Sequence, residues 1–143
     1  EYYNILKLTY QRLKNAEIPR KEFFYLCVEK LSHKDLIKLF LVKKGKVFVA
    51  GGIFLLLGDK VIFWRGASLS EYMSIGTNNF LYWEAIKWSI DNGYTSFDTL
   101  RNPSETLMNY KRGFGCKEFF SHSVVKISKL GNKVYAFKLP DIN

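Results

Sequence analysis

The chain has 143 residues, of which 48% are apolar and 17% aromatic, so it can form one domain with its own core and is not a disordered or low-complexity segment. Basic residues exceed acidic ones by 22 to 13, and the net charge of +9 favours partners that carry phosphates, although a basic surface that only aids solubility fits equally well. The two cysteines lack the spacing of a metal site or a disulfide framework, and the longest apolar run is far shorter than the ~20 residues of a transmembrane segment, so a cytoplasmic protein is expected.

Periodic apolar residues predict two helices at the start of the chain. In residues 2–13 they recur three and four positions apart, which is typical of an amphipathic helix. Pro19 can open a second helix, because the first helical position tolerates its missing N–H. The buried face of this second helix is expected to contain its regularly spaced apolar residues, Phe24, Cys27, Val28 and Leu31.

Three strands are predicted next, over residues 36–42, 46–57 and 61–67. Short turns that contain Gly45 and Gly58 separate them, so neighbouring strands should be antiparallel. The middle strand is apolar almost without alternation, which indicates that helices cover both of its faces. A layered α/β fold is therefore expected.

A crossover helix is predicted after the third strand. Thr77 or Asn78 can cap a helix that runs to about Asn92, and Gly93 can end it in the left-handed conformation. A short strand over residues 96–100 follows. Because a helix connects it to the preceding strand, the two should be parallel.

The last part of the chain is predicted to contain one helix and two strands. Asn102, Pro103 and Glu105 have the properties of a capped helix start, with Glu at the third position, and Gly113 should end this helix. The strands are expected over residues 119–127 and 133–138. Residues 1–143 are thus predicted to form a single domain. Because the chain begins with Glu1 rather than Met, we expect it to be part of a longer, possibly two-domain protein.

This order of elements is similar to the GNAT N-acetyltransferase fold without its first strand. The resemblance implies a central mixed, mostly antiparallel sheet with helices on both faces. It also implies one pair of parallel strands that splay apart, with the acyl donor in the opening.

Two motifs carry a closer resemblance. Residues 79–88 read Asn-Phe-Leu-Tyr-Trp-Glu-Ala-Ile-Lys-Trp and lead through Gly93 to Phe97-Asp98, and residues 110–115 read Tyr-Lys-Arg-Gly-Phe-Gly. Both resemble motifs of the C-terminal domain of the Fem-type (FemABX) peptidoglycan aminoacyltransferases and of FemAB-related acetyltransferases. The similar region covers about half of the chain.

The Fem-type resemblance implies a transferase that moves an aminoacyl group from aminoacyl-tRNA to an amine of a cell-envelope precursor. Relatives acylate other amines in polysaccharide or cell-envelope pathways. Full-length members carry two such domains side by side, so an upstream domain of the same protein is an expected partner. No tightly bound cofactor is implied.

Lys111 is the first candidate catalytic residue. A cation at a helix end, beside Gly113, could neutralise a phosphate or the oxyanion that forms as an amine attacks an ester or thioester. The resemblance implies that this lysine lies near the donor end of the acyl group. We expect it to be exposed at the rim of the slot, so that Lys111→Ala loses transfer without a change in folding. A lysine that only interacts with the helix dipole is the alternative.

Asp98 and Tyr110 are the other candidate catalytic residues. Asp98 ends a strand that faces the expected slot, where its carboxylate could accept a proton from the attacking amine or cap a loop. Tyr110 could protonate a leaving group, but it stands one residue after the usual GNAT position, so a packing role is the preferred interpretation. Arg101 and Arg112 are weaker candidates for phosphate binding.

The donor is inferred from the residues before the crossover helix. Acetyl-CoA-dependent GNAT enzymes have a glycine-rich loop there, whose N–H groups hold pyrophosphate. Residues 71–78 keep only Gly76 and include Glu71, so aminoacyl-tRNA is preferred to coenzyme A as donor. Thr77, Asn78 and the helix N-terminus can still bind an anion.

No metal ion and no covalent enzyme intermediate are expected. His33 and His122 lie in different predicted elements without carboxylates at a metal-binding spacing, and nothing resembles a Ser-His-Asp arrangement. Three functions remain open. The first is an acyltransferase that acts on an amine of an envelope or polysaccharide precursor, the second an acetyl-CoA-dependent N-acetyltransferase, and the third a non-catalytic half that only binds tRNA or an anionic precursor.

Overall fold

The computed structural model describes residues 1–13, 17–100 and 104–119. Its helices and strands follow in chain order: α1 (Tyr2–Arg12), α2 (Lys21–Ser32), β1 (Ile37–Lys44), β2 (Val47–Leu57), β3 (Lys60–Ser68), the 3-10 helix η1 (Ser70–Ile75), α3 (Thr77–Asp91), β4 (Ser96–Asp98) and α4 (Glu105–Arg112). Except for η1, each of these elements was predicted. The two strands predicted at the end of the chain lie outside the described residues, apart from Phe119.

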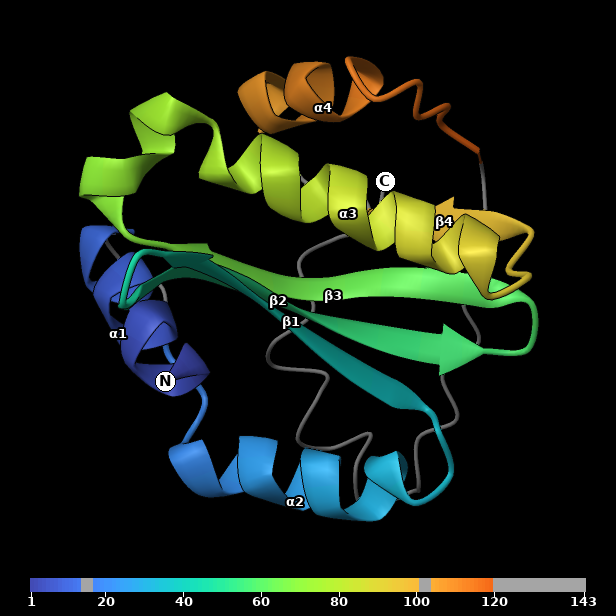
Figure 1. Cartoon of the computed structure of the whole chain (residues 1–143), viewed down its shortest axis with the longest axis horizontal. Coiled ribbons are helices and arrows are strands. Elements are labelled where there is room, and N and C mark those ends of the chain that lie inside the picture. The colour runs from blue at the N-terminus through green and yellow to red at the C-terminus, as the bar shows by residue number, and fades with distance from the viewer. Residues whose placement is uncertain (14–16, 101–103, 120–143) are drawn as a thin grey trace, which may run out of the picture.

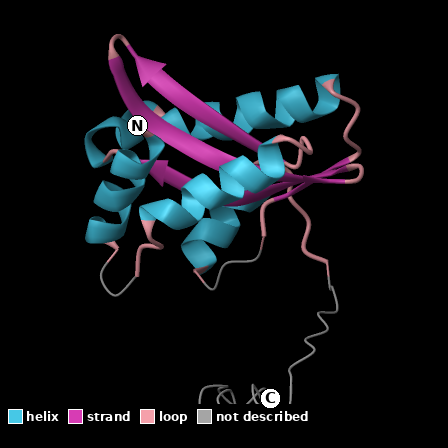
Figure 2. Ribbon diagram, turned by 90° about the horizontal axis from the view of Figure 1, so that it is seen from below, coloured by secondary structure: helices cyan, strands magenta, loops and turns pink. Residues whose placement is uncertain are grey.

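The four strands form one sheet in the order β1-β2-β3-β4. β1 and β3 both pair with β2 antiparallel, whereas β3 and β4 are parallel because α3 carries the chain back between them. The strands twist relative to one another (Figure 2). β1 lies at one edge of this sheet, and its register with β2 shifts between Val42 and Lys43. The predicted mixed, mostly antiparallel sheet is confirmed.

Helices cover both faces of the sheet (Figure 1): α1 and α2 lie on one face, and α3 and α4 on the other. Neighbouring residues of β2 reach different cores. Ile53 packs with residues of α1 and α2, whereas Phe54 packs with Ala85 of α3. The strand is therefore buried from both sides, which explains its nearly continuous apolar sequence.

Two glycines in the middle of β2 allow aromatic rings to lie directly on the strand. A Cβ atom on Gly51 would lie 2.9 Å from the ring of Tyr2 on one face, and one on Gly52 would lie 2.6 Å from the ring of Phe63 on the other. Both distances are too short for real contacts. The glycines are thus required for packing, although they interrupt the apolar run in the sequence.

The beginnings of α2 and α3 differ from the prediction. α2 starts at Lys21 instead of Pro19. Gly76, in the left-handed conformation with φ 77°, is the N-cap of α3, so neither Thr77 nor Asn78 caps this helix. The hydroxyl of Thr77 instead donates to the carbonyl of Tyr72 in η1 at 3.0 Å. The turn of η1 thus uses the side chain that was expected to cap the helix.

α2 and α4 show two further differences. Phe24 is the only buried residue of α2, and Val28, which was expected on its buried face, is 43% exposed. α4 has Ser104 as its N-cap, so Glu105 is its first residue and not its third. Asn102 and Pro103 lie outside the described residues. Gly93 follows α3 with φ 78°, as predicted.

Alkaline conditions are expected to unfold the protein through its buried tyrosines. Tyr2 is 7% exposed, and its hydroxyl donates to the carbonyl of Arg65 at 3.0 Å. Burial raises the pKa of Tyr2 above its usual value of 10.0, and burial does the same for Tyr82. The unfolded chain loses these protons near pH 10 while the folded protein keeps them, so the stability present below about pH 10 is lost as the pH rises.

Thermal unfolding followed by circular dichroism at increasing pH tests this expectation. The Tm should fall steeply above about pH 10, and Tyr2→Phe should make that fall shallower. Tyr25, which is 64% exposed, provides the control, because Tyr25→Phe should leave the slope unchanged. Equal effects of the two substitutions would contradict the role of buried tyrosines.

Candidate active site

The two parallel strands stay together over a very short distance. Residues 60–62 of β3 pair with residues 96–98 of β4, after which β4 ends and β3 continues to Ser68. The register of β3 with β2 also shifts between Ile53 and Phe54, as at a β-bulge. Within the described part of the chain, no strand pairs with the β4 side of β3 beyond residue 62, whereas β2 pairs with its other side to Ser68.

This separation leaves the backbone of Gly66 without a partner among the described residues. Leu69 donates its N–H to the carbonyl of Val49 at 2.9 Å, and hydrogen-bonded and open pairs alternate along an antiparallel ladder. The pair of Gly52 and Gly66 is therefore open, so the N–H and C=O of Gly66 point away from β2. No described residue bonds to them, and Gly66 is exposed. Gly66 thus offers a free donor and a free acceptor at the edge of β3.

Helix α1 closes the end of the same edge. The Thr9 hydroxyl accepts a hydrogen bond from the Ser68 N–H at 3.1 Å. Arg12 donates to the Ser68 carbonyl at 3.4 Å and to the Ser70 hydroxyl at 2.8 Å. Since these contacts occupy the groups of Ser68, the open part of the edge is centred on Gly66.

The start of α3 offers further free donors. Phe80 is the first residue of the helix whose N–H reaches a helical partner, the Gly76 carbonyl at 3.0 Å. The N–H groups of residues 77–79 have no backbone partner among the described residues, as at most helix N-termini. Thr77 is buried and Asn78 is half-buried. An anion could meet backbone N–H groups here, whereas the Thr77 hydroxyl is already bonded.

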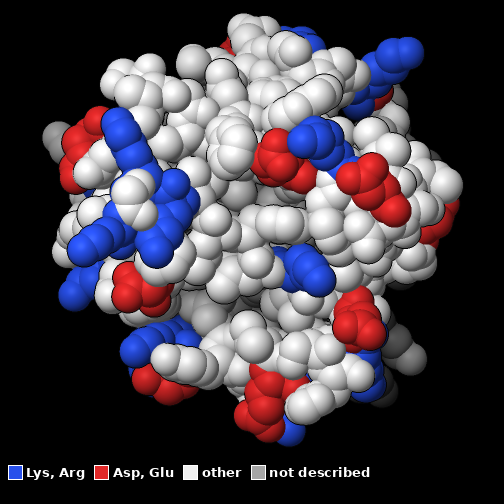
Figure 3. All heavy atoms as spheres, viewed as in Figure 1, with Lys and Arg blue, Asp and Glu red and all other residues white. Residues whose placement is uncertain are grey.

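Positive charge gathers close to this helix start. Lys43, Lys44 and Lys46 are exposed at the tip of the β1–β2 hairpin. Figure 3 shows Lys and Arg side chains clustered at the left, where Figure 1 places that hairpin. The Nζ atom of Lys44 lies 5.6 Å from the ring centre of Tyr72 in η1. Part of the excess positive charge of the sequence is therefore concentrated beside η1.

Lys111 lies in the last turn of α4 and is not exposed at the rim of the expected slot. It is only 5% exposed, and its Nζ donates to the carbonyls of Thr99 and Leu100 at 2.8 and 2.5 Å. These carbonyls belong to the loop between β4 and α4. Burial lowers the pKa of Lys111, and the nearby Cys116 and Asp98 oppose this effect. The expectation of an exposed lysine was wrong, because its ammonium ties α4 to the loop after β4.

Asp98 supports the same loop. Its Oδ1 atom accepts a hydrogen bond from the Leu100 N–H at 2.7 Å, and Leu100 adopts a positive φ of 55°. Few residues other than glycine adopt this conformation without support. Asp98 is half-buried and therefore still accessible. The loop-capping alternative for Asp98 is thus present in the structure, and its catalytic role stays a prediction.

A cavity of about 420 Å³ lies at the end of β4, and the residues just described line it. Asp98, Lys111, Arg112 and Cys116 are part of its wall. The thiol of Cys116 is 4.0 Å from the Thr99 hydroxyl. The structure thus brings Asp98 and Lys111 together in the wall of one cavity, and their shared function stays a prediction.

Tyr110 points to the other side of α4, toward α3. Its ring contacts Tyr82 and Phe114, with centroids 5.5 and 5.3 Å away, and Tyr82 in turn contacts Phe63 of β3. The Tyr110 hydroxyl is buried and has no hydrogen-bond partner among the described residues. Burial raises its pKa to about 12, so it stays protonated at neutral pH. The ring packs, as preferred, but the hydroxyl is free to donate.

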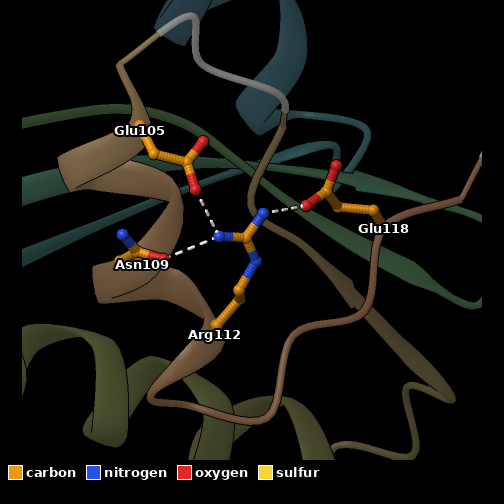
Figure 4. A network of polar contacts seen from close by, with 4 residues as sticks. All are labelled: Glu105, Asn109, Arg112 and Glu118. Carbon is orange, nitrogen blue, oxygen red and sulfur yellow. Dashed lines mark hydrogen bonds and ion pairs between the residues drawn. The ribbon is translucent and has the colours of Figure 1, made fainter.

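Arg112 is already paired with carboxylates (Figure 4). It donates to Glu105 at 2.6 Å, to Glu118 at 2.5 Å and to the Asn109 side chain at 2.6 Å. These two ion pairs leave little of its charge for a phosphate group. Arg101, the other arginine candidate, lies outside the described residues. Gly113 lies with Tyr110 in the wall of a second cavity, between α3 and α4.

Gly66 is the residue of the candidate site that sequence reasoning missed. Gly66 contributes only backbone groups, and the signal that could have found it is the unexplained glycine near the end of an apolar strand.

The described residues contain no group of three His, Cys, Asp or Glu side chains that could hold a metal ion. Nor does any helix within them have the length and apolar character needed to span a bilayer.

Comparisons with known proteins identify a family and a set of similar folds. Residues 6–112 match the family model described as acetyltransferase (GNAT) domain. No curated protein matches the sequence. A similar solved structure is an aminoglycoside acetyltransferase from an uncultured soil metagenomic sample in complex with sisomicin, with a TM-score of 0.66 and 14% identity over 88% of each chain.

Two further structures have the same fold. The ribosomal-protein-S18-alanine N-acetyltransferase from Escherichia coli has a TM-score of 0.63 and 14% identity, over 92% of this chain and 83% of that chain. AAC(6')-Iy in complex with a bisubstrate analog of CoA and acetylneamine has a TM-score of 0.62 and 10% identity, over 88% of this chain and 90% of that chain. At these identities the similarity establishes the fold alone.

Proposed function

This chain belongs to the GNAT acetyltransferase family, and from that premise we propose that it is an acetyl-CoA-dependent N-acetyltransferase whose acceptor is a primary amine. Family membership makes it an acyltransferase, because the matched region covers residues 6–112. The nature of the donor and of the acceptor is the proposed part.

The observation that carries the proposal is the separation of β3 and β4 after three paired residues. It leaves the N–H and the C=O of the exposed Gly66 without a partner in the part of the chain that the structure describes. Such an edge can bind an extended, amide-containing chain as a further strand would be bound. The pantetheine arm of coenzyme A is a chain of this kind, so the residues present fit the donor at this position.

The start of α3 fits the phosphates of the same donor. The unpaired N–H groups of residues 77–79 and the helix dipole favour an anion, and exposed lysines of the β1–β2 hairpin lie close to η1. η1 stands directly before α3, at the place of the glycine-rich loop of acetyl-CoA-dependent GNAT enzymes, so the N–H groups at the helix start itself would bind the phosphates. The lack of that loop is therefore a weaker argument against coenzyme A than the sequence suggested.

No comparison supports aminoacyl-tRNA as donor or a Fem-type relationship. The AAC(6')-Iy structure contains a bisubstrate analog built on CoA. The similar structures include an aminoglycoside acetyltransferase and a ribosomal-protein-S18-alanine N-acetyltransferase, and the second name specifies acetylation on nitrogen. The acetyl-CoA alternative from the sequence is thus the better supported one, and an envelope precursor has no specific support as the acceptor.

The reaction requires two proton transfers, and residues of this chain can take part in both. The amine nitrogen bonds to the acetyl carbon, the C–S bond breaks, the nitrogen loses a proton and the sulfur gains one. We assign the Tyr110 hydroxyl as the group that donates a proton to the leaving sulfur. This hydroxyl is protonated, buried and without a hydrogen-bond partner among the described residues. Asp98 is the candidate to receive the proton of the amine, while Lys111 holds the loop that positions Asp98.

Thermal unfolding with candidate donors tests the proposal. Acetyl-CoA should raise the Tm by an amount that grows with its concentration, since a ligand at 100 times its Kd adds about 2.7 kcal/mol of stability. Mass spectrometry should then detect acetylation of an amine from a panel that contains an aminoglycoside and a peptide with a free N-terminal alanine. A protein that is stabilised by aminoacyl-tRNA and not by acetyl-CoA would contradict the proposal.

The same assay separates the enzyme from a binding-only domain. Stabilisation by acetyl-CoA without acetylation of any amine in the panel, and without hydrolysis of the thioester, would favour a binding module. Free coenzyme A serves as the control ligand, because it should stabilise the protein but support no transfer.

A further inference from the structure

Arg65 of β3 is a half-buried cation without a carboxylate partner among the described residues. None of the ion pairs between those residues involves it, whereas two glutamates hold Arg112. Its side chain donates from Nη1 to the hydroxyl of Tyr10 in α1. The Nε–H is buried and has no acceptor in this part of the chain. Because a buried charge is costly unless it is paired, an anion bound at this guanidinium would stabilise it.

The β-bulge in β3 sets the direction of the Arg65 side chain. The register with β2 shifts here, and Trp64 is the residue of β3 without a partner across the ladder. Such an irregularity can re-aim a side chain. Trp64 packs on Phe24 of α2, and Arg65 reaches Tyr10 of α1. Both side chains thus lie on the face of the sheet that α1 and α2 cover, opposite to α3 and α4 (Figure 1).

Two neighbours orient the guanidinium and leave most of its donors available. The central carbon of the guanidinium lies 5.5 Å from the ring centre of Trp64, as in a cation–π contact. The contact with Tyr10 uses one N–H group of Nη1, and no described residue accepts from Nη2. Since the Tyr10 oxygen is the acceptor in that contact, its own O–H can still donate. A planar set of N–H groups beside a hydroxyl matches the two oxygens of a carboxylate.

This guanidinium stands next to the edge of β3 where the proposed acyl donor would lie. Arg65 directly precedes Gly66, and consecutive Cα atoms are about 3.8 Å apart. The Tyr2 hydroxyl donates to the Arg65 carbonyl at 3.0 Å, which fixes the backbone at this point. Phe23 is 43% exposed, and its ring centre lies 5.9 Å from that of Trp64. One small molecule can therefore contact the cation, an apolar surface and the edge of β3.

We propose that Arg65 binds a carboxylate of the acetyl acceptor, with Trp64 and Phe23 as apolar contacts beside it. The acceptor is then a small amine that carries a carboxylate, such as an amino acid with an apolar side chain. A polycationic amine such as an aminoglycoside is disfavoured, because the guanidinium repels it. The inference rests on the proposed function in one respect, since it takes the acetyl donor to lie at Gly66, and it adds the class of acceptor.

NMR with a carboxylate that cannot react tests the binding step alone. The probe is N-acetyl-leucine, which has the carboxylate and an apolar side chain but no free amine, and N-acetyl-leucinamide is its neutral counterpart. The Nε–H resonance of Arg65, identified by its absence in Arg65→Lys, should shift on titration with N-acetyl-leucine and stay in place with the amide. A resonance that responds to neither compound, or equally to both, would overturn the carboxylate site.

Acetylation of leucine and of leucinamide by acetyl-CoA tests the same site in the reaction. Arg65→Gln should lower kcat/KM for leucine about 10- to 100-fold, as is typical for loss of a hydrogen bond to a charged group, and change the value for leucinamide less than about twofold. Arg20→Gln is the matched control, because Arg20 is exposed and precedes α2. It removes the same charge and should leave both values unchanged.

The two experiments separate this inference from the proposed function. Equal losses for leucine and leucinamide in Arg65→Gln, or faster acetylation of an aminoglycoside than of leucine, would overturn the acceptor class and leave the transferase intact. If acetyl-CoA supports transfer to no amine, the proposed function fails, and the NMR titration still decides whether Arg65 binds a carboxylate. If Arg65→Gln does not fold, Tyr10→Phe takes its place and should lower kcat/KM for leucine alone.

Discussion

Tyr110→Phe is expected to lower kcat about 100-fold and to leave the Tm unchanged or slightly higher. The activity should fall because the proposed proton donor to the leaving sulfur is lost, and general acids contribute about 10²–10⁴-fold to rate. Stability should not fall, because the buried hydroxyl has no hydrogen-bond partner among the described residues. Removing an unpaired buried polar group leaves no other group unsatisfied.

Steady-state kinetics and thermal unfolding of the same preparation check both halves of this prediction. Tyr94→Phe is the control, because Tyr94 packs on Trp88 at the far end of α3 and lines neither cavity. A full wild-type kcat in Tyr110→Phe would remove the hydroxyl from the mechanism. Since the pKa of Tyr110 is about 12, a loss of wild-type activity between pH 8 and about pH 10 would have to come from another group.

Lys111→Met is expected to lower the free energy of unfolding by about 2 kcal/mol. Methionine keeps most of the buried stem but leaves the carbonyls of Thr99 and Leu100 without their donor, and a buried unsatisfied group costs about 1–3 kcal/mol. The relief of a buried charge offsets part of that cost. The sequence-based expectation that this lysine can be removed without a change in folding is therefore replaced by the opposite one.

Denaturant unfolding measures this effect, with Lys87→Met as the matched control. Lys87 is an exposed lysine of α3 that pairs with Glu84, and an exposed pair is worth less than about 1 kcal/mol. Activity of Lys111→Met should also fall at temperatures well below its Tm, because the loop that presents Asp98 is no longer held. Equal stability of Lys111→Met and wild type would show that the two carbonyl contacts contribute nothing.

The sequence predicted the elements well where one periodic pattern ran through a whole element. The apolar spacing of α1 and the turn residues on either side of β2 placed both within one or two residues. η1 was missed because residues 70–75 have no periodic apolar pattern, and a 3-10 turn needs none. Its contact with Thr77 then moved the cap of α3 to Gly76.

The site was predicted less well, because its main contacts involve backbone groups. Lys111 was read as a surface lysine, since its partners are two carbonyls from another segment and carbonyls leave no trace in sequence. The free backbone of Gly66 follows from strand separation, which no local pattern specifies. Asp98 was placed at the cavity from the sequence because a carboxylate stands where a strand ends, and its catalytic role stays a prediction.

The outer side of β1 has consequences for how copies of the protein meet. A strand at the rim of a sheet exposes N–H and C=O groups that another molecule can pair with, and this is a common route to aggregation. β1 carries exposed Lys38, Lys43 and Lys44, and its register is irregular at Val42. Approach of two such strands would bring like charges together. We therefore expect concentrated solutions to remain clear at low ionic strength and to become turbid as added salt screens these lysines.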